Sequence, residues 1–315
     1  MAISTSILAS MVKSVIDSSE IPSSEPSRKL WMAAIKFPMY SVAIVPIATG
    51  TAVAYRNTGM INWSIFSTFL VSAVLILVWE NLCNDVFDAE TGIDVNKAHS
   101  VVNLTGKKNL IFAIANICLL LGISGVLAIS WLQQDVVVVS AIALCCFLGY
   151  IYQGPPFRLG YQGWGEILCF FAFGPLGVSA AYYSQTKSWS IGSISAAIIV
   201  GIITSLILFC SHFNQVADDL AAGKKSPVVR LGTERAAQLL PWICSVIYGI
   251  TIMAIMLHFF PIWTAIVLIS LPIAWKLCTF IGTNHESADL LLNCRFIAVA
   301  LHFVVGSCLS FSLIL

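Results

Sequence analysis

Long apolar runs recur along the whole chain, and they constrain its fold more than any other feature. About nine of them reach the roughly twenty residues that a helix needs to cross a bilayer. We place them near residues 38–55, 61–81, 110–132, 136–152, 165–183, 191–210, 240–258, 261–280 and 296–315. Only 10% of the 315 residues are charged, whereas a soluble domain carries about a quarter. Helices satisfy every backbone polar group inside lipid, so the sequence predicts an all-α integral membrane protein that crosses the bilayer several times.

The positive charges predict the orientation of these spans. With nine spans, the 16 Lys and Arg residues all fall on one side of the membrane except Arg56 and Lys187. The positive-inside rule puts that side in the cytoplasm or its equivalent. Residues 1–30 precede the first span and are expected to be a disordered tail or a short interfacial helix. Residues 31–315 form one transmembrane domain. The net charge of +1 argues against nucleic acid as a partner.

A first group of amides and carboxylates follows the second span. Asn81, Asp85 and Asp88 stand at i, i+4 and i+7, so a continuing helix would set them on one face. Asn84 lies among them. Oxygen ligands of this kind suit Mg²⁺, which takes one or two carboxylates together with the phosphates of a substrate. Asp94 is either a further ligand or a loop acid. A solvated helix end is the non-functional alternative.

A second acidic group, Asp218 and Asp219, follows the sixth span on the same predicted side. If that helix continues, Gln215 and Asp219 share one face and Asp218 lies on the next, and spacing alone leaves open which Asp points inward. Lys224 and Lys225 come next, where they either meet phosphate oxygens or only mark the topology. His212 is expected to be bonded within the bundle rather than to bind a metal.

Two carboxylate sites flanked by cations can hold a diphosphate through bridging Mg²⁺. The metal neutralises the leaving group as its C–O bond breaks, and the allylic cation that remains has to be kept from water. An apolar, aromatic cavity does this, and ring faces also attract a cation. The aromatic candidates for such a wall are Trp79, Phe157, Phe170, Phe171, Phe173, Tyr182 and Tyr183.

The first motif resembles that of the UbiA superfamily of intramembrane aromatic prenyltransferases, with Asn81, Asp85 and Asp88 matching NxxxDxxD residue for residue. The resemblance covers nearly the whole chain after residue 27. Asp219 matches the last Asp of the second motif, but the first Asp of that motif is Gln215 here. The ligand set of the second metal therefore departs from the family pattern.

The resemblance implies a bundle of about nine helices around a central cavity, Mg²⁺ as cofactor and a prenyl diphosphate as substrate. It implies Asp85, Asp88 and Asp219 as metal ligands and catalytic residues, with Asp94 and Asp218 as weaker candidates. The substrate-binding candidates are Asn81, Asn84, Tyr152, Arg158, Gln215, Lys224 and Lys225.

Within the superfamily, residues 84–94 and 223–232 are similar to the branch that prenylates 1,4-dihydroxy-2-naphthoate. Residues 152–159 and 215–219 are similar to the phytyl-transferring members from cyanobacteria and plastids. This implies transfer of a prenyl group, phytyl by resemblance, to dihydroxynaphthoate with loss of CO₂, in phylloquinone or menaquinone biosynthesis. The membrane would then be a cyanobacterial plasma or thylakoid membrane, or a plastid membrane.

The loop after the fourth span matches the family's Tyr…Pro…Gly-x-Gly-Glu pattern, which begins at Tyr152. Arg158 is the only cation of this loop. Its planar guanidinium pairs bidentately with carboxylates and phosphates, so we expect it either to bind the acceptor's carboxylate or to anchor the loop at the interface. Glu166 opens the fifth span, where a carboxylate favours the helix dipole, and a structural role is at least as well supported as a catalytic one.

Two other functions remain open from the sequence. A proton- or ion-coupled transporter also places Asp residues in membrane helices, although more often in mid-span than at helix ends beside lysines. A prenyltransferase for homogentisate, 4-hydroxybenzoate or a chlorophyllide keeps the chemistry and changes the acceptor. Consumption of a prenyl diphosphate with Mg²⁺ separates the first alternative from the enzyme.

Overall fold

The computed structural model describes residues 28–35, 37–93 and 100–315, and every regular element in these ranges is helical. Eight spans are long and apolar enough to cross a membrane: Pro38–Thr58, Trp63–Thr91, Lys108–Gln133, Gly165–Thr186, Ile191–Asn214, Thr233–Met256, Ile262–Asn284 and Leu290–Ile314. The shorter apolar helix α7 (Val137–Gln153) brings the described spans close to the predicted nine. The main boundary differences are that α4 (Trp63–Thr91) extends ten residues beyond the expected end and that α13 (Thr233–Met256) begins earlier.

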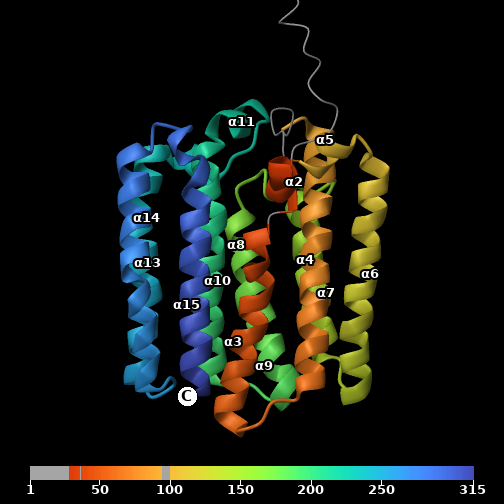
Figure 1. The fold of residues 1–315 in the computed structure, drawn as a ribbon, viewed down its shortest axis with the longest axis vertical. Coiled ribbons are helices and arrows are strands. Elements are labelled where there is room, and N and C mark those ends of the chain that lie inside the picture. Colours follow the sequence, from red (N-terminus) through yellow and green to blue (C-terminus); the bar gives the residue numbers. More distant parts are fainter. Residues whose placement is uncertain (1–27, 36, 94–99) are drawn as a thin grey trace, which may run out of the picture.

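The long helices stand side by side and alternate in direction (Figure 1). The remaining membrane helices are α3 (Ser41–Thr58), α6 (Lys108–Gln133), α10 (Ile191–Ser211), α14 (Leu271–Asn284), which continues the 3₁₀ turn η4 (Ile262–Ser270), and α15 (Cys294–Ile314). The C-terminal end of α4 lies at the same end of the bundle as the short helices α5 (Val101–Thr105), α11 (Val216–Ala221) and α12 (Pro227–Leu231). Both acidic motifs therefore lie at one end, as the sequence predicts. We call this the motif end.

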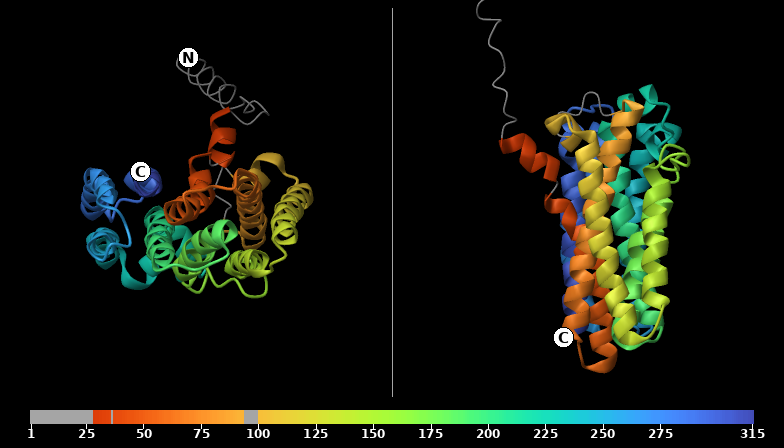
Figure 2. Two further views of the ribbon diagram at one scale, coloured as in Figure 1. Left: turned by 90° about the horizontal axis from the view of Figure 1, so that it is seen from below. Right: turned by 90° about the vertical axis from the view of Figure 1, so that its right-hand side faces the viewer.

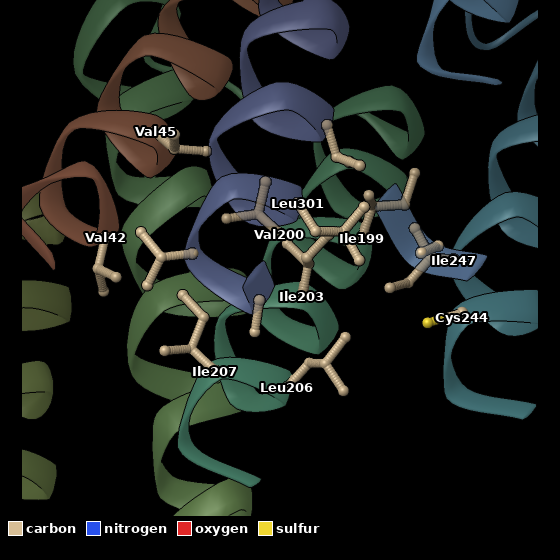
Figure 3. Close-up of a cluster of buried hydrophobic side chains, with 14 of the residues drawn as sticks. Val42, Val45, Ile199, Val200, Ile203, Leu206, Ile207, Cys244, Ile247 and Leu301 are labelled. Carbon is tan, nitrogen blue, oxygen red and sulfur yellow. The ribbon is translucent and has the colours of Figure 1, made fainter. Parts of the chain in front are cut away.

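Helix α10 forms the centre of the bundle, with α3, α13 and α15 packed around it. Its residues Ile199, Ile203 and Leu206 are almost fully buried and meet side chains of the three neighbouring helices (Figure 3). In lipid the hydrophobic effect does not hold helices together, so association depends on close packing. Seen end-on, α13, α14 and α15 lie to one side of this centre and α4, α6 and α7 to the other (Figure 2).

The fifth span is broken into α8 (Gly165–Phe171), a π-helical turn η2 (Ala172–Val178) and α9 (Ser179–Thr186). Pro175 lies inside the π turn, where its missing N–H and its ring disrupt regular α-helical bonding. Gly174 lets this turn touch α10, since a Cβ there would come within 2.4 Å of the Ala197 carbonyl oxygen and 2.7 Å of the Gly201 Cα. The backbones of η2 and α10 are therefore in direct contact.

The N-terminal region is described only from residue 28. Helix α2 (Arg28–Ile35) and the 3₁₀ turn η1 (Phe37–Tyr40) lead into α3. The predicted tail, residues 1–30, lies almost wholly outside the described residues, and its last residues already belong to α2.

Candidate active site

A cavity of about 310 Å³ lies between α3, α4, α7, α8, η2, α10 and the start of α15. Its wall at the motif end is polar and carries Glu80, Asn81, Asn84, Tyr152 and Gln215. Toward the opposite end the wall becomes apolar, with Ile47, Phe69 and Ile142. Along α4 the lining extends from Asn84 to Phe69, about 22 Å at 1.5 Å per residue. The predicted central cavity is thus present, long and amphipathic.

The first motif lies on one uninterrupted helix. The side chain of Asn62 caps the start of α4 by accepting a bond from the Ile65 N–H at 3.1 Å, and Gly92 ends the helix at φ 77°. No Gly or Pro interrupts the helix between these caps. Helical order therefore runs through Asn81, Asp85 and Asp88, and the predicted stripe on one face is confirmed.

The two carboxylates of this stripe bind different neighbours. Asp85 is 1% exposed and accepts a bond at 2.9 Å from the Val101 N–H at the start of α5. Asp88 accepts bonds from the Gln153 amide and, at 3.1 Å, from the Tyr161 hydroxyl. Neither carboxylate lines the cavity itself, and both lie just beyond Asn81 and Asn84, which do. The first motif therefore borders the polar end of the cavity.

The expected continuation of the sixth span through the second motif is wrong, although Gln215 and Asp219 keep their i, i+4 relation: Gln215 directly precedes α11, and its carbonyl accepts a bond from the Asp219 N–H at 2.8 Å. Helix α10 ends at Ser211, a 3₁₀ turn η3 (His212–Asn214) follows, and α11 begins only at Val216. The break has a physical cause: His212 Nδ1 lies 3.1 Å from Asp219 Oδ2, whereas residues seven apart in an α-helix are separated by about 10 Å along its axis. The chain folds back to make this contact.

Asp219 is the centre of a buried ionic cluster. Its other oxygen lies 3.3 Å from Lys224 Nζ, and His212 Nε2 lies 3.4 Å from a Glu166 oxygen. Asp219 and His212 are 1% and 3% exposed. Burial raises the pKa of Asp219, but the hydrogen bond with His212 and the charge of Lys224 outweigh it and hold that pKa below its usual range. Asp219 therefore stays an anion, and His212 is bonded within the bundle as expected.

Tyr161 connects the two motifs. Its hydroxyl lies 2.6 Å from Thr91 Oγ1 and 3.1 Å from Asp88, while its ring centroid lies 5.8 Å from Lys224 Nζ. Its carbonyl accepts a bond from the Lys225 N–H at 2.7 Å. Burial, and then the nearby Asp88 charge, raise the pKa of Tyr161, so the hydroxyl remains a donor. The Tyr161 side chain thus contacts Asp88 of the first motif and Lys224, the ion-pair partner of Asp219 in the second.

The other predicted site residues fall into three groups. Asn81, Asn84, Tyr152 and Gln215 line the cavity. Lys224 joins the Asp219 cluster, whereas Lys225 is exposed and Asp218 is half-buried. Arg158 does not line the cavity and pairs with Glu90 at 3.6 Å. Asp94 lies outside the described residues.

The sequence model of the UbiA prenyltransferase family matches residues 43–299, which contain both acidic motifs and most of the cavity lining. The chain belongs to the UbiA prenyltransferase family. It is therefore an integral membrane prenyltransferase, and the transporter alternative is set aside.

Curated relatives and solved structures agree with this membership. A 2-carboxy-1,4-naphthoquinone phytyltransferase from Synechocystis sp. is 54% identical over 90% of this chain and 93% of that protein. The chloroplastic enzyme of the same name from Arabidopsis thaliana is 40% identical over 92% and 78%. A UbiA homologue from Archaeoglobus fulgidus, solved with GPP and Mg²⁺, superposes with a TM-score of 0.54 at 16% identity, covering 90% of this chain and 99% of that one. This last likeness concerns the fold.

Sequence reasoning missed several side chains of this UbiA site. Tyr161 was not singled out because its partners Thr91 and Asp88 are about 70 residues away in sequence, and no local spacing reveals that contact. Arg295 lines the cavity from the start of α15, although the sequence shows it only as a cation at a membrane boundary. Of the seven aromatic candidates, Trp79 and Phe173 line the cavity.

The motif end has the chemistry that a hard cation requires. Asn214 Oδ1 and Glu166 Oε2 are buried and accept no hydrogen bond from the described residues, while Asp219 Oδ1 and Glu166 Oε1 have only the ion-pair contacts with Lys224 and His212 described above. Within the described ranges no three His, Cys, Asp or Glu side chains form a complete metal site. Mg²⁺ binds through one or two carboxylates and takes its other ligands from phosphate and water. The donors present therefore fit Mg²⁺ brought in with a diphosphate.

Proposed function

We propose that this chain transfers the phytyl group of phytyl diphosphate to 1,4-dihydroxy-2-naphthoate, with loss of the carboxyl group as CO₂, in a Mg²⁺-dependent reaction of phylloquinone biosynthesis. One observation supports this choice of substrates. Over nearly the full length of both chains, the protein is 54% identical to a relative named 2-carboxy-1,4-naphthoquinone phytyltransferase. The reaction joins prenyl carbon 1 to the ring and releases diphosphate.

The cavity supports a long prenyl donor. Its polar end carries amides next to the first acidic motif, and its apolar wall continues about 22 Å along α4 to Phe69. A long isoprenoid fits such a channel with its diphosphate at the motif end and its tail toward Phe69. Tyr152, Trp79 and Phe173 add aromatic surface to the wall, where ring faces favour a cation and water is displaced.

Mg²⁺, when bound, would supply the charge that neutralises the diphosphate as it leaves, and Asp85, Asp88 and Asp219 are the residues proposed to hold it. Lys224 forms an ion pair with the Asp219 carboxylate, and its ammonium group could also bind phosphate oxygens of the substrate. Asn81, Asn84 and Gln215 offer neutral donors and acceptors at the polar end of the cavity. We further propose that the motif end faces the cytoplasm or stroma, since Arg56 and Lys187 are the only cations assigned to the other side.

The test is a matrix of acceptors and donors with purified protein in lipid nanodiscs. The acceptors are 1,4-dihydroxy-2-naphthoate, homogentisate and 4-hydroxybenzoate, and the donors are phytyl, geranylgeranyl and solanesyl diphosphates, each with Mg²⁺ and with EDTA. We expect the highest kcat/KM for the naphthoate with phytyl diphosphate, release of one CO₂ per product, and no turnover with EDTA. Preference for another acceptor, or turnover without a divalent cation, contradicts the proposal.

A further inference from the structure

The cavity wall contains two charged side chains among the described residues, Glu80 on α4 and Arg295 on α15. Every other cation that the structure describes lies outside the lining. Placing a positive charge in an apolar membrane cavity costs free energy. A bound anion would lower that cost. The proposed reaction brings two anions into this cavity: a diphosphate and an aromatic carboxylate.

Arg295 has no anionic partner among the residues that the structure describes. It is the second residue of α15 and is half-buried, and no carboxylate of residues 28–35, 37–93 or 100–315 pairs with it. Its guanidinium carbon lies 5.1 Å from the centre of the Phe296 ring. Stacking on a ring occupies the face of a guanidinium and leaves its N–H edge for planar, bidentate partners. Arg295 is thus oriented by its contact with Phe296, and no described residue supplies its counter-ion.

The position of Arg295 separates it from the first of the two acidic motifs. It lies on α15, which packs mainly on α3, α10 and η4, whereas Asp85 and Asp88 lie on α4, which packs mainly on α6, α3 and α7. In Figure 1, α3 stands between α15 and α4. The turn η1 packs against α15, and its Pro38 and Met39 line the cavity together with Phe296, so the wall on this side of the cavity includes apolar surface.

We propose that Arg295 binds the carboxylate of the aromatic acceptor and thereby selects 2-carboxylated naphthalenes over their carboxyl-free analogues. The assignment rests on the proposed function. A carboxylate attached to a flat ring matches the bidentate edge of a guanidinium, and the apolar surface on the same side of the cavity suits the fused rings. Lys224, bound to Asp219 on the second motif, serves the diphosphate instead.

The assignment has a consequence for turnover. The carboxyl group leaves as CO₂, so the product no longer carries the anion that Arg295 binds. Product and acceptor therefore do not compete on equal terms for this subsite, and the loss of one charged contact favours replacement of the product by a new acceptor molecule.

The test compares Arg295→Gln and Arg295→Lys with the wild type. For Arg295→Gln we expect the KM for 1,4-dihydroxy-2-naphthoate to rise about 10- to 100-fold, the loss of a charge-assisted hydrogen bond, while the KM for phytyl diphosphate stays within about threefold. The acceptor 1,4-dihydroxynaphthalene, which lacks the carboxyl group, should be converted equally by both proteins. Arg295→Lys should recover part of the naphthoate preference. Arg56→Gln, at the opposite end of the bundle, is the matched control.

Two outcomes overturn the proposal in folded protein: a selective rise in the KM for phytyl diphosphate, or an equal loss with both acceptors. An effect from Arg158→Gln and none from Arg295→Gln would assign the carboxylate to the loop instead. Equilibrium binding of 1-hydroxy-2-naphthoate, followed by tryptophan fluorescence, separates this proposal from the proposed function. Arg295-dependent binding without any turnover would refute the function and keep the subsite, whereas turnover with Arg295-independent binding would do the reverse.

Discussion

The two acidic motifs present carboxylates at the same end of the bundle by different means. Asp85 and Asp88 lie on α4, a helix of 29 residues whose order needs only its caps and its uninterrupted sequence. Asp219 lies on α11, a helix of six residues that follows a break, and is held by His212 and Lys224. Local periodicity thus fixes the first motif, whereas tertiary contacts fix the second. The first should tolerate changes in its surroundings, and the second should not.

The largest effect is expected from the first motif. The double variant Asp85→Asn, Asp88→Asn should lower kcat/KM for the diphosphate by about 10³-fold or more, because it removes the charge proposed to hold the metal and its leaving group. Folding should be nearly unaffected, since asparagine keeps the shape and α4 keeps its caps. Glu90→Gln is the control: among the described residues this exposed side chain pairs with Lys108 and Arg158, and such surface pairs contribute little. Full turnover by a correctly inserted double variant would refute the assignment.

The adjacent acids of the second motif should differ. Asp219→Ala should reduce kcat/KM about 10²-fold and also lower the thermal midpoint, because His212 and Lys224 lose their shared anion. Asp218→Ala, at a half-buried position without an ion pair among the described residues, should keep most of the activity. Kinetics and thermal unfolding of both variants in the same nanodiscs provide the measurement. A dead Asp218→Ala with an active Asp219→Ala would reverse the proposed facing.

Lys224 and Lys225 offer a matched pair for the dependence of the second motif on its surroundings. Lys224→Met removes the cation 3.3 Å from Asp219 and should reduce kcat/KM about tenfold, the scale of one charged hydrogen bond. Lys225→Met removes an exposed side chain and should change kcat/KM less than threefold. Equal effects of the two variants would show that the lysines act only through the overall charge of the loop.

The smallest effect should come from the residue that joins the motifs. Tyr161→Phe keeps the ring near Lys224 and removes the hydroxyl bonds to Asp88 and Thr91. We expect a three- to tenfold rise in the Mg²⁺ concentration needed for half-maximal activity, in line with the net contribution of one hydrogen bond. Tyr150→Phe is the control, because within the described part of the chain the Tyr150 hydroxyl, near the end of α7, donates to the Pro155 carbonyl and to neither acidic motif. A change in thermal midpoint without a shift in Mg²⁺ dependence would indicate a purely structural role for Tyr161.

The difference between local helical spacing and tertiary contacts also explains which features could be predicted from the sequence. The apolar runs and the stripe of Asn81, Asp85 and Asp88 depend on helical spacing. The structure confirms the stripe and has eight candidate spans, together with the shorter α7, where about nine were expected. The break after Ser211 depends on a contact between His212 and Asp219, which offsets the loss of regular helical hydrogen bonds. No pattern in the sequence predicts this contact. Arg295 and Arg158 carry equal charge in the sequence, and only the packing of α15 turns the former into the cavity. The roles of the site residues remain predictions.

The contact between η2 and α10 has a consequence for how molecules enter and leave. Backbone atoms meet at Gly174 and Gly201, so this part of the wall cannot swell without separating two helices. The lining also includes Met32 and Phe296, whose side chains are exposed and can change rotamer more easily than packed backbone can separate. The alkylated quinone is bulkier than either reactant and dissolves in acyl chains. We expect the product to leave between η1 and α15, directly into the hydrocarbon region of the membrane. Product release then needs no opening toward water.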